Sequence, residues 1–208
     1  MRILFWFVLF FLYSNNLKSE NAVNIAFNRN VLITTDTGGN CSGFTIETGL
    51  VLTAKHCVED AKEVRVNDIL VDEIIVSQDR DVAKLKVKTK NFKRIAFTKS
   101  LAIGDKVRMV GNPIGKVGWS FHGEISFLSQ DGMVHTSFIG VPGTSGAGVI
   151  TDQGKFCGIH TGYYYYTDPT GLETRMSGIF VPYNLFPELV EEKKSVIIID
   201  LPILPQGN

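Results

Sequence analysis

Short segments in which apolar and polar residues alternate follow one another along most of this chain. Alternation at period 2 predicts strands with one buried face, and the clearest case is Val-Ala-Lys-Leu-Lys-Val at residues 82–87. Gly, Pro, Asn and Asp separate the segments, and strands this short and closely spaced suggest antiparallel barrels or sandwiches. The one convincing helix spans Tyr183 to Lys193, where an apolar stripe follows one face and Pro187 falls in the first turn. The pattern therefore predicts an all-β fold with a C-terminal α-helix.

Length and composition fit a globular protein of modest size. The chain has 208 residues, of which 44% are hydrophobic and 20 are glycine, enough for one large domain or two small packed ones. The net charge is zero, whereas a nucleic-acid binder is usually basic, so we expect no nucleic-acid partner. The strand series begins again after the loosely patterned region 88–103. We therefore predict lobes at residues 20–95 and 96–194, followed by a tail at 195–208.

The first 19 residues have the composition of a secretory signal peptide. A positive residue, Arg2, precedes an apolar run of 11 residues from Ile3 to Tyr13, and polar residues follow. This run is short for a membrane-spanning helix, which needs about 20 residues, but suits a signal peptide. No Ala-x-Ala site is present, so cleavage after Ser19 and cleavage after Ser14 both stay open, as does an uncleaved anchor. We expect a secreted protein, extracellular or periplasmic, with no stable membrane association once residues 1–19 are removed.

A serine flanked by glycines lies between two apolar, strand-like runs. The sequence Pro-Gly-Thr-Ser-Gly-Ala-Gly at residues 142–148 places Ser145 between Gly143 and Gly146. Acyl transfer needs a hydroxyl that stands clear of other side chains and backbone N–H groups aimed at a developing oxyanion. Glycine lets the backbone turn this tightly and lets a substrate approach. On its own, the turn is equally compatible with an ordinary surface loop.

Two further motifs stand upstream of this turn. They are Thr-Ala-Lys-His-Cys at residues 53–57 and Asp-Val-Ala-Lys-Leu at residues 81–85. Together with Gly-Thr-Ser-Gly at 143–146 they give the order His, Asp, Ser, which resembles the chymotrypsin-fold, trypsin-like serine proteases over roughly residues 30–190. The resemblance implies two six-stranded antiparallel β-barrels, one in each lobe, with the site in the crevice between them and a helix at the C-terminus.

The resemblance also assigns roles to individual residues. His56 matches the general base, Asp81 the carboxylate that orients the imidazole, and Ser145 the nucleophile. Asp79, two residues earlier on the same face of a strand, is the alternative carboxylate. The backbone N–H groups of Gly143 and Ser145 match the oxyanion hole, where loss of one donor costs on the order of 3 kcal/mol of transition-state stabilisation. We expect no cofactor and no metal.

Three cysteines are present, Cys41, Cys57 and Cys157. An exported protein meets oxidising conditions, so a disulfide is plausible, and an odd number leaves at least one thiol. The resemblance implies that Cys41 and Cys57 pair beside the histidine loop, while two buried free thiols are the alternative. Such a bridge would stabilise the fold by roughly 3 kcal/mol on a chain-entropy argument. We expect Cys157 to act as a small apolar residue in a buried strand.

The residues that match the family's primary specificity pocket are Ile139, Gly140, His160, Thr161, Gly162 and Gly178. No acid falls at the pocket base, where Ile139 lies, so a strict Lys or Arg preference is disfavoured. The sequence Gly-Ile-His at 158–160 resembles the glutamyl endopeptidases and the viral 3C-type proteases, in which the equivalent histidine contacts an acidic or amide side chain. The threonine expected near Gly140 is missing, so a Glu/Gln preference and a small or apolar preference both stay open. Residues 163–175, which begin with four tyrosines, are expected to form a long loop beside this pocket.

The sequence thus predicts a secreted serine endopeptidase that acts on protein or peptide substrates through an acyl-enzyme, with no oligomeric state specified. The alternative is a catalytically inactive member of the fold that serves as a binding protein. Such members usually lack His, Asp or Ser, whereas all three have candidates here. An α/β-hydrolase esterase is disfavoured, because those chains run Ser, Asp, His with helices between strands. Thr144 stands where digestive members have the Asp used in zymogen activation, which indicates the bacterial and viral branches instead.

Overall fold

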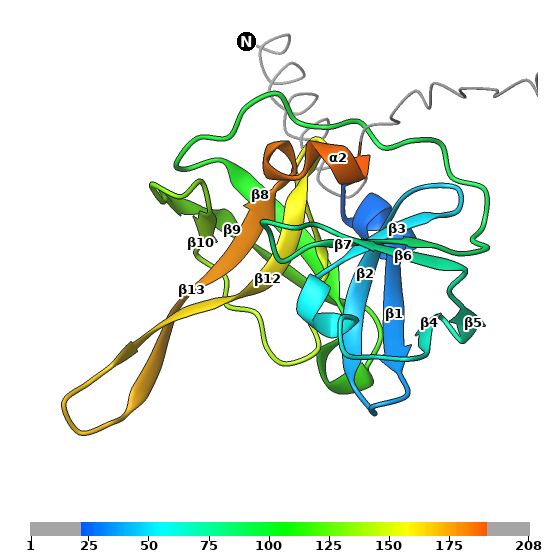
Figure 1. Ribbon diagram of the computed structural model, residues 1–208. Helices are drawn as coiled ribbons and strands as arrows, with labels where there is room; N and C mark the ends of the chain where they lie inside the picture. The colour runs from blue at the N-terminus through cyan, green and yellow to red at the C-terminus, as the bar shows by residue number, and fades with distance from the viewer. Residues whose placement is uncertain (1–21, 191–208) are drawn as a thin grey trace, which may run out of the picture.

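The computed structural model describes residues 22–190 and is mostly β-structure (Figure 1). Within these residues, thirteen strands form two antiparallel sheets, which confirms the all-β prediction. The expected signal peptide at 1–19 and the tail at 195–208 lie outside the described residues. Across the range that is described, no helix has the length and apolar character needed to cross a membrane.

The first sheet has seven strands, in the order β5-β4-β1-β2-β3-β7-β6. Their bounds are β1 (Asn30–Thr35), β2 (Asn40–Glu47), β3 (Leu50–Thr53), β4 (Val64–Val66), β5 (Ile69–Leu70), β6 (Glu73–Val76) and β7 (Ala83–Lys86). The sheet curls around a core that includes Ile33, Val51 and Leu85, all fully buried. The alternation in 82–87 therefore places its apolar face on this core, as predicted.

The two edges of this sheet are joined by the chain and not by hydrogen bonds between strands. β5 forms one edge and β6, which follows it directly along the chain, forms the other. Between them, the Val71 N–H donates to Val64 O, and the Asp72 N–H donates to Lys86 O. Because Val71 bonds to β4 and Asp72 bonds to β7, at opposite ends of the sheet, the chain crosses the gap without folding back into a hairpin. The result is a curled half-barrel, and not the closed six-stranded barrel that the resemblance implied for this lobe.

The second sheet closes into the expected six-stranded barrel, in the order β10-β13-β12-β11-β8-β9. Its strands are β8 (Lys106–Gly111), β9 (Trp119–Leu128), β10 (Val134–Thr136), β11 (Gly148–Thr151), β12 (Phe156–Thr167) and β13 (Glu173–Pro182). Buried residues that include Met109, Val149 and Phe180 fill its interior. Cys157 is also buried there.

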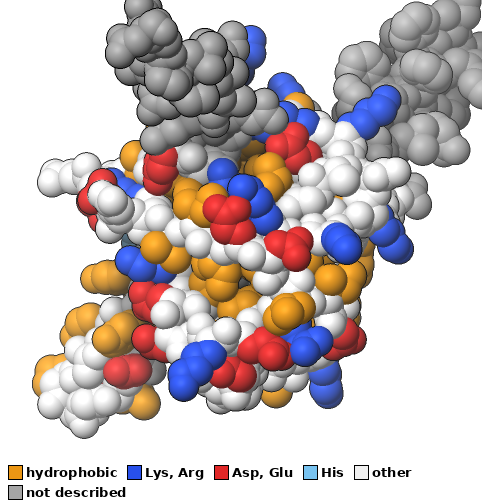
Figure 2. All heavy atoms as spheres, turned by 45° about the vertical axis from the view of Figure 1, so that its right-hand side comes forward, with side chains coloured by type: hydrophobic (Ala, Val, Ile, Leu, Met, Phe, Trp, Pro, Cys, Tyr) orange, Lys and Arg blue, Asp and Glu red, His pale blue; other side chains and the backbone are white. Residues whose placement is uncertain are grey.

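Strands β12 and β13 extend well beyond the barrel as a hairpin (Figure 1). They stay paired as far as Thr167 and Glu173, so the long loop expected over 163–175 is wrong. Consecutive tyrosines favour a strand, and the Asp168 carboxylate accepts the Leu172 N–H to close the turn. Hydrophobic side chains on this hairpin are exposed, and Figure 2 shows hydrophobic, acidic and basic side chains interspersed over one face of the molecule.

A third cluster of buried residues lies between the two sheets. Phe44 of β2 stacks on Phe156 of β12 with ring centroids 5.3 Å apart, and Phe97 meets Phe156 edge-on at 5.5 Å. Residues 22–29 form a helix that the sequence did not predict. This helix buries Ala22 and Ala26 in the cluster, and alanines four residues apart give only a weak hydrophobic stripe.

The expected C-terminal helix is confirmed, but it begins later than Tyr183. Residues Tyr183–Leu185 form a 3-10 turn, η3, and α2 spans Pro187–Val190 with Leu189 and Val190 buried. The helix begins at Pro187 because proline has no N–H to donate inside a helix. The rest of the helix expected up to Lys193 lies outside the described residues.

We predict that Phe156→Ala lowers the free energy of unfolding by about 3–5 kcal/mol, because loss of the ring leaves a cavity in the core between the two sheets. Chemical denaturation followed by tryptophan fluorescence measures this loss. The control is Phe127→Ala, whose ring is 53% exposed and which should change the stability by less than about 1 kcal/mol. Equal losses for the two variants would contradict a shared core between the sheets.

Candidate active site

His56 and Asp81 form a hydrogen-bonded pair at the rim of the first sheet. His56 lies in the 3-10 turn η1 (Lys55–Cys57), which follows β3 after one residue, and Asp81 lies two residues before β7. Because β3 and β7 pair at Thr53 and Ala83, the two side chains meet. His56 Nδ1 lies 2.7 Å from Asp81 Oδ2, and the His56 backbone N–H donates to Asp81 Oδ1 at 2.9 Å. One carboxylate thus holds both the ring and the backbone of the histidine.

The alternative carboxylate, Asp79, is exposed and makes no hydrogen bond or ion pair with any described residue. The carboxylate nearest the imidazole is therefore Asp81.

The pairing changes the acidity of both groups. The hydrogen bond that His56 donates to Asp81 raises the pKa of His56 above its usual value, although burial opposes this. For Asp81, burial raises the pKa, but hydrogen bonds from the His56 ring and backbone more than offset it, so that its pKa is lowered. Asp81 is therefore ionised, and its charge stabilises a protonated imidazole beside it.

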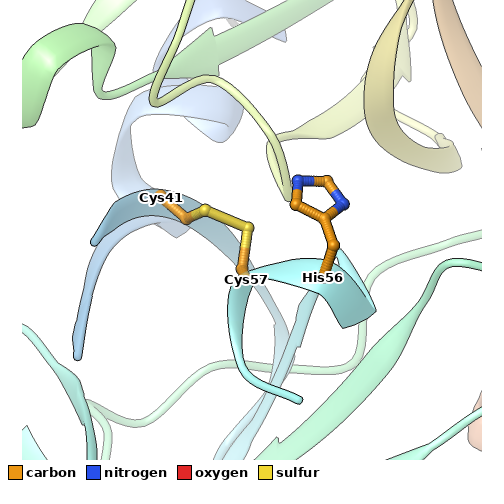
Figure 3. Close-up of side chains that lie close together, drawn as sticks. All are labelled: Cys41, His56 and Cys57. Carbon is orange, nitrogen blue, oxygen red and sulfur yellow. A yellow bond between two sulfur atoms is a disulfide. The ribbon is translucent and has the colours of Figure 1, made fainter. Parts of the chain in front are cut away.

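Ser145 lies in the turn between β10 and β11, against the loop that carries His56. Its carbonyl oxygen accepts the Ser42 N–H at 2.8 Å and lies 3.9 Å from Cys57 Sγ. Cys57 directly follows His56, and a ring nitrogen of His56 lies within 4.8 Å of both cysteine sulfurs. Figure 3 shows the imidazole standing beside the Cys41–Cys57 bridge, with one ring nitrogen on the side of the bridge and the other facing away. The serine turn and the loop that carries His56 therefore lie against each other, one from each sheet.

The Ser145 hydroxyl makes no hydrogen bond with His56 or with any other described residue. Catalytic hydrogen bonds are often long before a substrate binds and shorten in the complex. The hydroxyl is thus free to turn toward either the imidazole or a ligand.

Two neighbouring backbone N–H groups in this turn are free. The N–H groups of Thr144, Gly146 and Ala147 each donate to a backbone carbonyl, whereas those of Gly143 and Ser145 donate to no described residue. Gly143 has φ +94°, a conformation that glycine adopts without strain. A β-carbon at this position would lie 2.6 Å from Asn112 O. Two free N–H donors in the turn that carries a serine are the kind of groups that bind an oxyanion.

The cysteine predictions are confirmed. Cys41 and Cys57 form a disulfide with an S–S distance of 2.02 Å, and Cys157 is a free, buried thiol. Burial raises the pKa of Cys157 to about 12, so it carries no thiolate at neutral pH and suits a packing role. Cys41, His56 and Cys57 cluster closely enough to hold a metal, but disulfide sulfurs are not thiolate ligands and this group does not fit one.

Three of the six predicted pocket residues come together around His160. The His160 ring lies between Gly140 and Gly178: a β-carbon on Gly140 would be 2.1 Å from Nε2, and one on Gly178 would be 3.4 Å from Cε1. A threonine at position 140 would therefore collide with the imidazole, which explains its absence. His160 is only 2% exposed, and burial lowers its pKa to about 4 against an opposing hydrogen bond to the Ile179 backbone. The ring is thus uncharged at neutral pH.

The other three predicted pocket residues lie nearby. Ile139 is half-buried just before Gly140. Thr161 and Gly162 lie on β12 where it leaves the barrel, and a β-carbon on Gly162 would meet no atom within 4 Å. The strand is therefore open at this point.

The sequence did not identify Ser42, which contacts the serine turn through both its backbone and its side chain. A single serine outside the three motifs gives no signal of such a role.

A protein-family model described as a trypsin-like peptidase domain matches residues 41–159, more than half of the chain. This chain belongs to the trypsin-like peptidase family. The matched region contains His56, Asp81 and Ser145. The likeness to the glutamyl-endopeptidase and viral 3C-type branches stays a prediction.

The fold of this trypsin-like domain is also similar to a solved structure, the serine endoprotease from Yersinia pestis. The two share 23% sequence identity with a TM-score of 0.69, over 83% of this chain and 65% of that chain. The trypsin-like domain thus spans about 65% of the length of that structure, and at this identity the likeness concerns the fold. No curated protein sequence matches the chain.

Proposed function

We propose that this protein is a serine endopeptidase in which Ser145, His56 and Asp81 act as a catalytic triad. The observation that carries the proposal is the His56–Asp81 hydrogen bond of 2.7 Å, formed beside a turn with two unpaired N–H groups. Membership of the trypsin-like peptidase family supports the same activity. The substrates are proteins or peptides, as the family implies.

The proposed reaction passes through an acyl-enzyme. Ser145 Oγ attacks the scissile carbonyl while His56 Nε2 accepts its proton, and Asp81 stabilises the imidazolium at Nδ1. The N–H groups of Gly143 and Ser145 donate to the oxyanion of the tetrahedral intermediate. His56 then gives the proton to the leaving amine, and an ester joins the acyl group to Ser145. Water, activated by His56, hydrolyses this ester and regenerates the serine.

We also propose that the protein is exported, with residues 1–19 as a signal peptide. The Cys41–Cys57 bridge supports this proposal, because disulfides persist in oxidising compartments and are rare in the cytosol.

A Glu/Gln preference before the scissile bond is supported by His160, whose Nε2 faces Gly140 at the predicted pocket. Because His160 is uncharged at neutral pH and one ring nitrogen is hydrogen-bonded to the Ile179 backbone, the other ring nitrogen can accept a hydrogen bond from a glutamine amide but offers no positive charge to a carboxylate. Burying an unpaired carboxylate is costly. The geometry therefore favours glutamine over glutamate.

The competing function is a catalytically inactive binding protein, and covalent labelling distinguishes the two. We expect a fluorophosphonate probe to label the wild-type protein, since the probe reacts only with an activated serine. Ser145→Ala and His56→Ala should abolish labelling, whereas Ser120→Ala, at an exposed serine on β9, should leave it unchanged. Labelling that survives Ser145→Ala would mean that another residue is the nucleophile, and an unlabelled wild type would favour the binding protein.

The rate of labelling should fall as the pH is lowered, because only neutral His56 can accept the serine proton. Asp81 raises the pKa of His56 above 6.5, so the midpoint of this decline should lie above pH 6.5. NMR titration of the imidazole should give a lower His56 pKa in Asp81→Asn, in which the charge is lost. The proposal fails if the Asp81→Asn substitution leaves the His56 pKa where it was.

A peptide panel that varies only the residue before the cut tests the specificity. We expect cleavage after Gln to exceed cleavage after Glu by roughly tenfold, since the carboxylate would be buried without a partner. His160→Ala should lower the ratio of cleavage after Gln to cleavage after Leu. His135→Ala, at a histidine lining a groove on β10, should leave this ratio unchanged. Efficient cleavage only after Leu or Phe would remove His160 from substrate recognition.

A further inference from the structure

The serine turn is held from the opposite sheet by one residue, Ser42. This residue lies on β2 and is fully buried. Its backbone N–H donates to Ser145 O at 2.8 Å, and its hydroxyl donates to Gly143 O at 2.8 Å. The carbonyls that Ser42 binds thus belong to the same two residues whose N–H groups are free.

The direction of the Ser42 hydroxyl is fixed by a third bond. The Asn112 backbone N–H donates to Ser42 Oγ at 2.8 Å. Since that N–H can only donate, Oγ accepts there, and its single proton is directed to Gly143 O. Asn112 is itself fully buried, and its side chain donates to Val31 O at 2.7 Å and accepts from Asn30 Nδ2 at 2.7 Å. The hydroxyl therefore belongs to a buried network that spans both sheets.

These hydrogen bonds matter because Gly143, as a glycine, can adopt many backbone conformations and could otherwise change the direction of its N–H. The peptide before Gly143 is fixed by the Ile114 N–H, which donates to Pro142 O at 3.0 Å. The peptide after Gly143 is fixed on its carbonyl side by Ser42 Oγ. With both carbonyls bound, Gly143 cannot rotate without breaking a hydrogen bond, and such a bond contributes about 0.5–1.5 kcal/mol. Its N–H therefore keeps one direction.

We propose that Ser42 is a positioning residue whose side-chain hydroxyl holds the oxyanion donor of Gly143 in place. The inference rests on the proposed peptidase function. A hydroxyl that fixes the Gly143 N–H should stabilise mainly the transition state, in which charge develops on the oxyanion, and should contribute little to substrate binding.

The test is the Ser42→Ala variant. The concentration of active sites is measured from the acylation burst, and kcat is calculated per active site, so that misfolded protein does not lower the apparent kcat. We expect kcat to fall about tenfold with KM within about twofold, a smaller loss than the 100- to 1000-fold typical of removing a donor itself. The affinity for a peptide boronic acid, which forms a tetrahedral adduct with the serine, should weaken by the same factor as kcat. The affinity for the cleaved product peptide should stay the same.

Two variants separate positioning from stability. Ser177 lies on β13 and is also buried, and its hydroxyl lies within hydrogen-bonding distance of His135 Nδ1, at 2.8 Å. Ser177→Ala removes this hydroxyl and should leave kcat and boronate affinity unchanged. Ser42→Thr keeps the hydroxyl and should retain most of the activity. If Ser42→Ala does not fold, Ser42→Gly removes the same hydroxyl and takes its place.

The outcomes distinguish this inference from the proposed function. A wild type that cleaves peptides, together with a Ser42→Ala variant of unchanged kcat, overturns the positioning role alone. An equal loss of boronate and product affinity also overturns it, because that result means general damage to the site. A wild type that neither cleaves nor reacts with the fluorophosphonate overturns both proposals.

Discussion

The contact between β2 and the turn at residues 142–147 is the constraint on which the rest of the site depends. Ser42 binds the carbonyls of both Gly143 and Ser145, which are partly buried, and each such hydrogen bond contributes about 0.5–1.5 kcal/mol. Because Ser42 follows Cys41, which is bonded to Cys57, the same short stretch fixes the serine turn and the histidine loop. The two sheets therefore meet in one defined arrangement, which hydrophobic contact alone would not specify.

Two histidines near this contact illustrate how environment separates the roles of one residue type. The pKa of His56 is raised because its ring is hydrogen-bonded to Asp81 while still partly exposed. The pKa of His160 is lowered to about 4, because the ring is buried away from a counter-charge. One imidazole can therefore take up a proton during a reaction, whereas the other stays neutral and serves as a fixed hydrogen-bonding group.

Local patterns in the sequence predicted the features that depend on nearby residues. The alternation in 82–87 predicted a strand, and glycines around Ser145 predicted a tight turn. The disulfide between Cys41 and Cys57 was predicted only through the family resemblance, since spacing does not determine pairing. The half-barrel, the helix at 22–29 and the β12–β13 hairpin were missed, because each depends on which surfaces meet after folding and not on a local period.

The sequence by itself determined the all-β class, the order of the three motifs and the buried character of Cys157, because these follow from side-chain chemistry and short-range periodicity. Only the tertiary structure decided that Asp81 and not Asp79 faces His56, that His160 is uncharged, and that Ser42 contacts the serine turn. Each of these depends on residues that are 18 or more positions apart in the chain, and folding alone sets the distance between such residues. The residue types thus determine which chemistry the site can perform, and the packing of the two sheets determines its geometry.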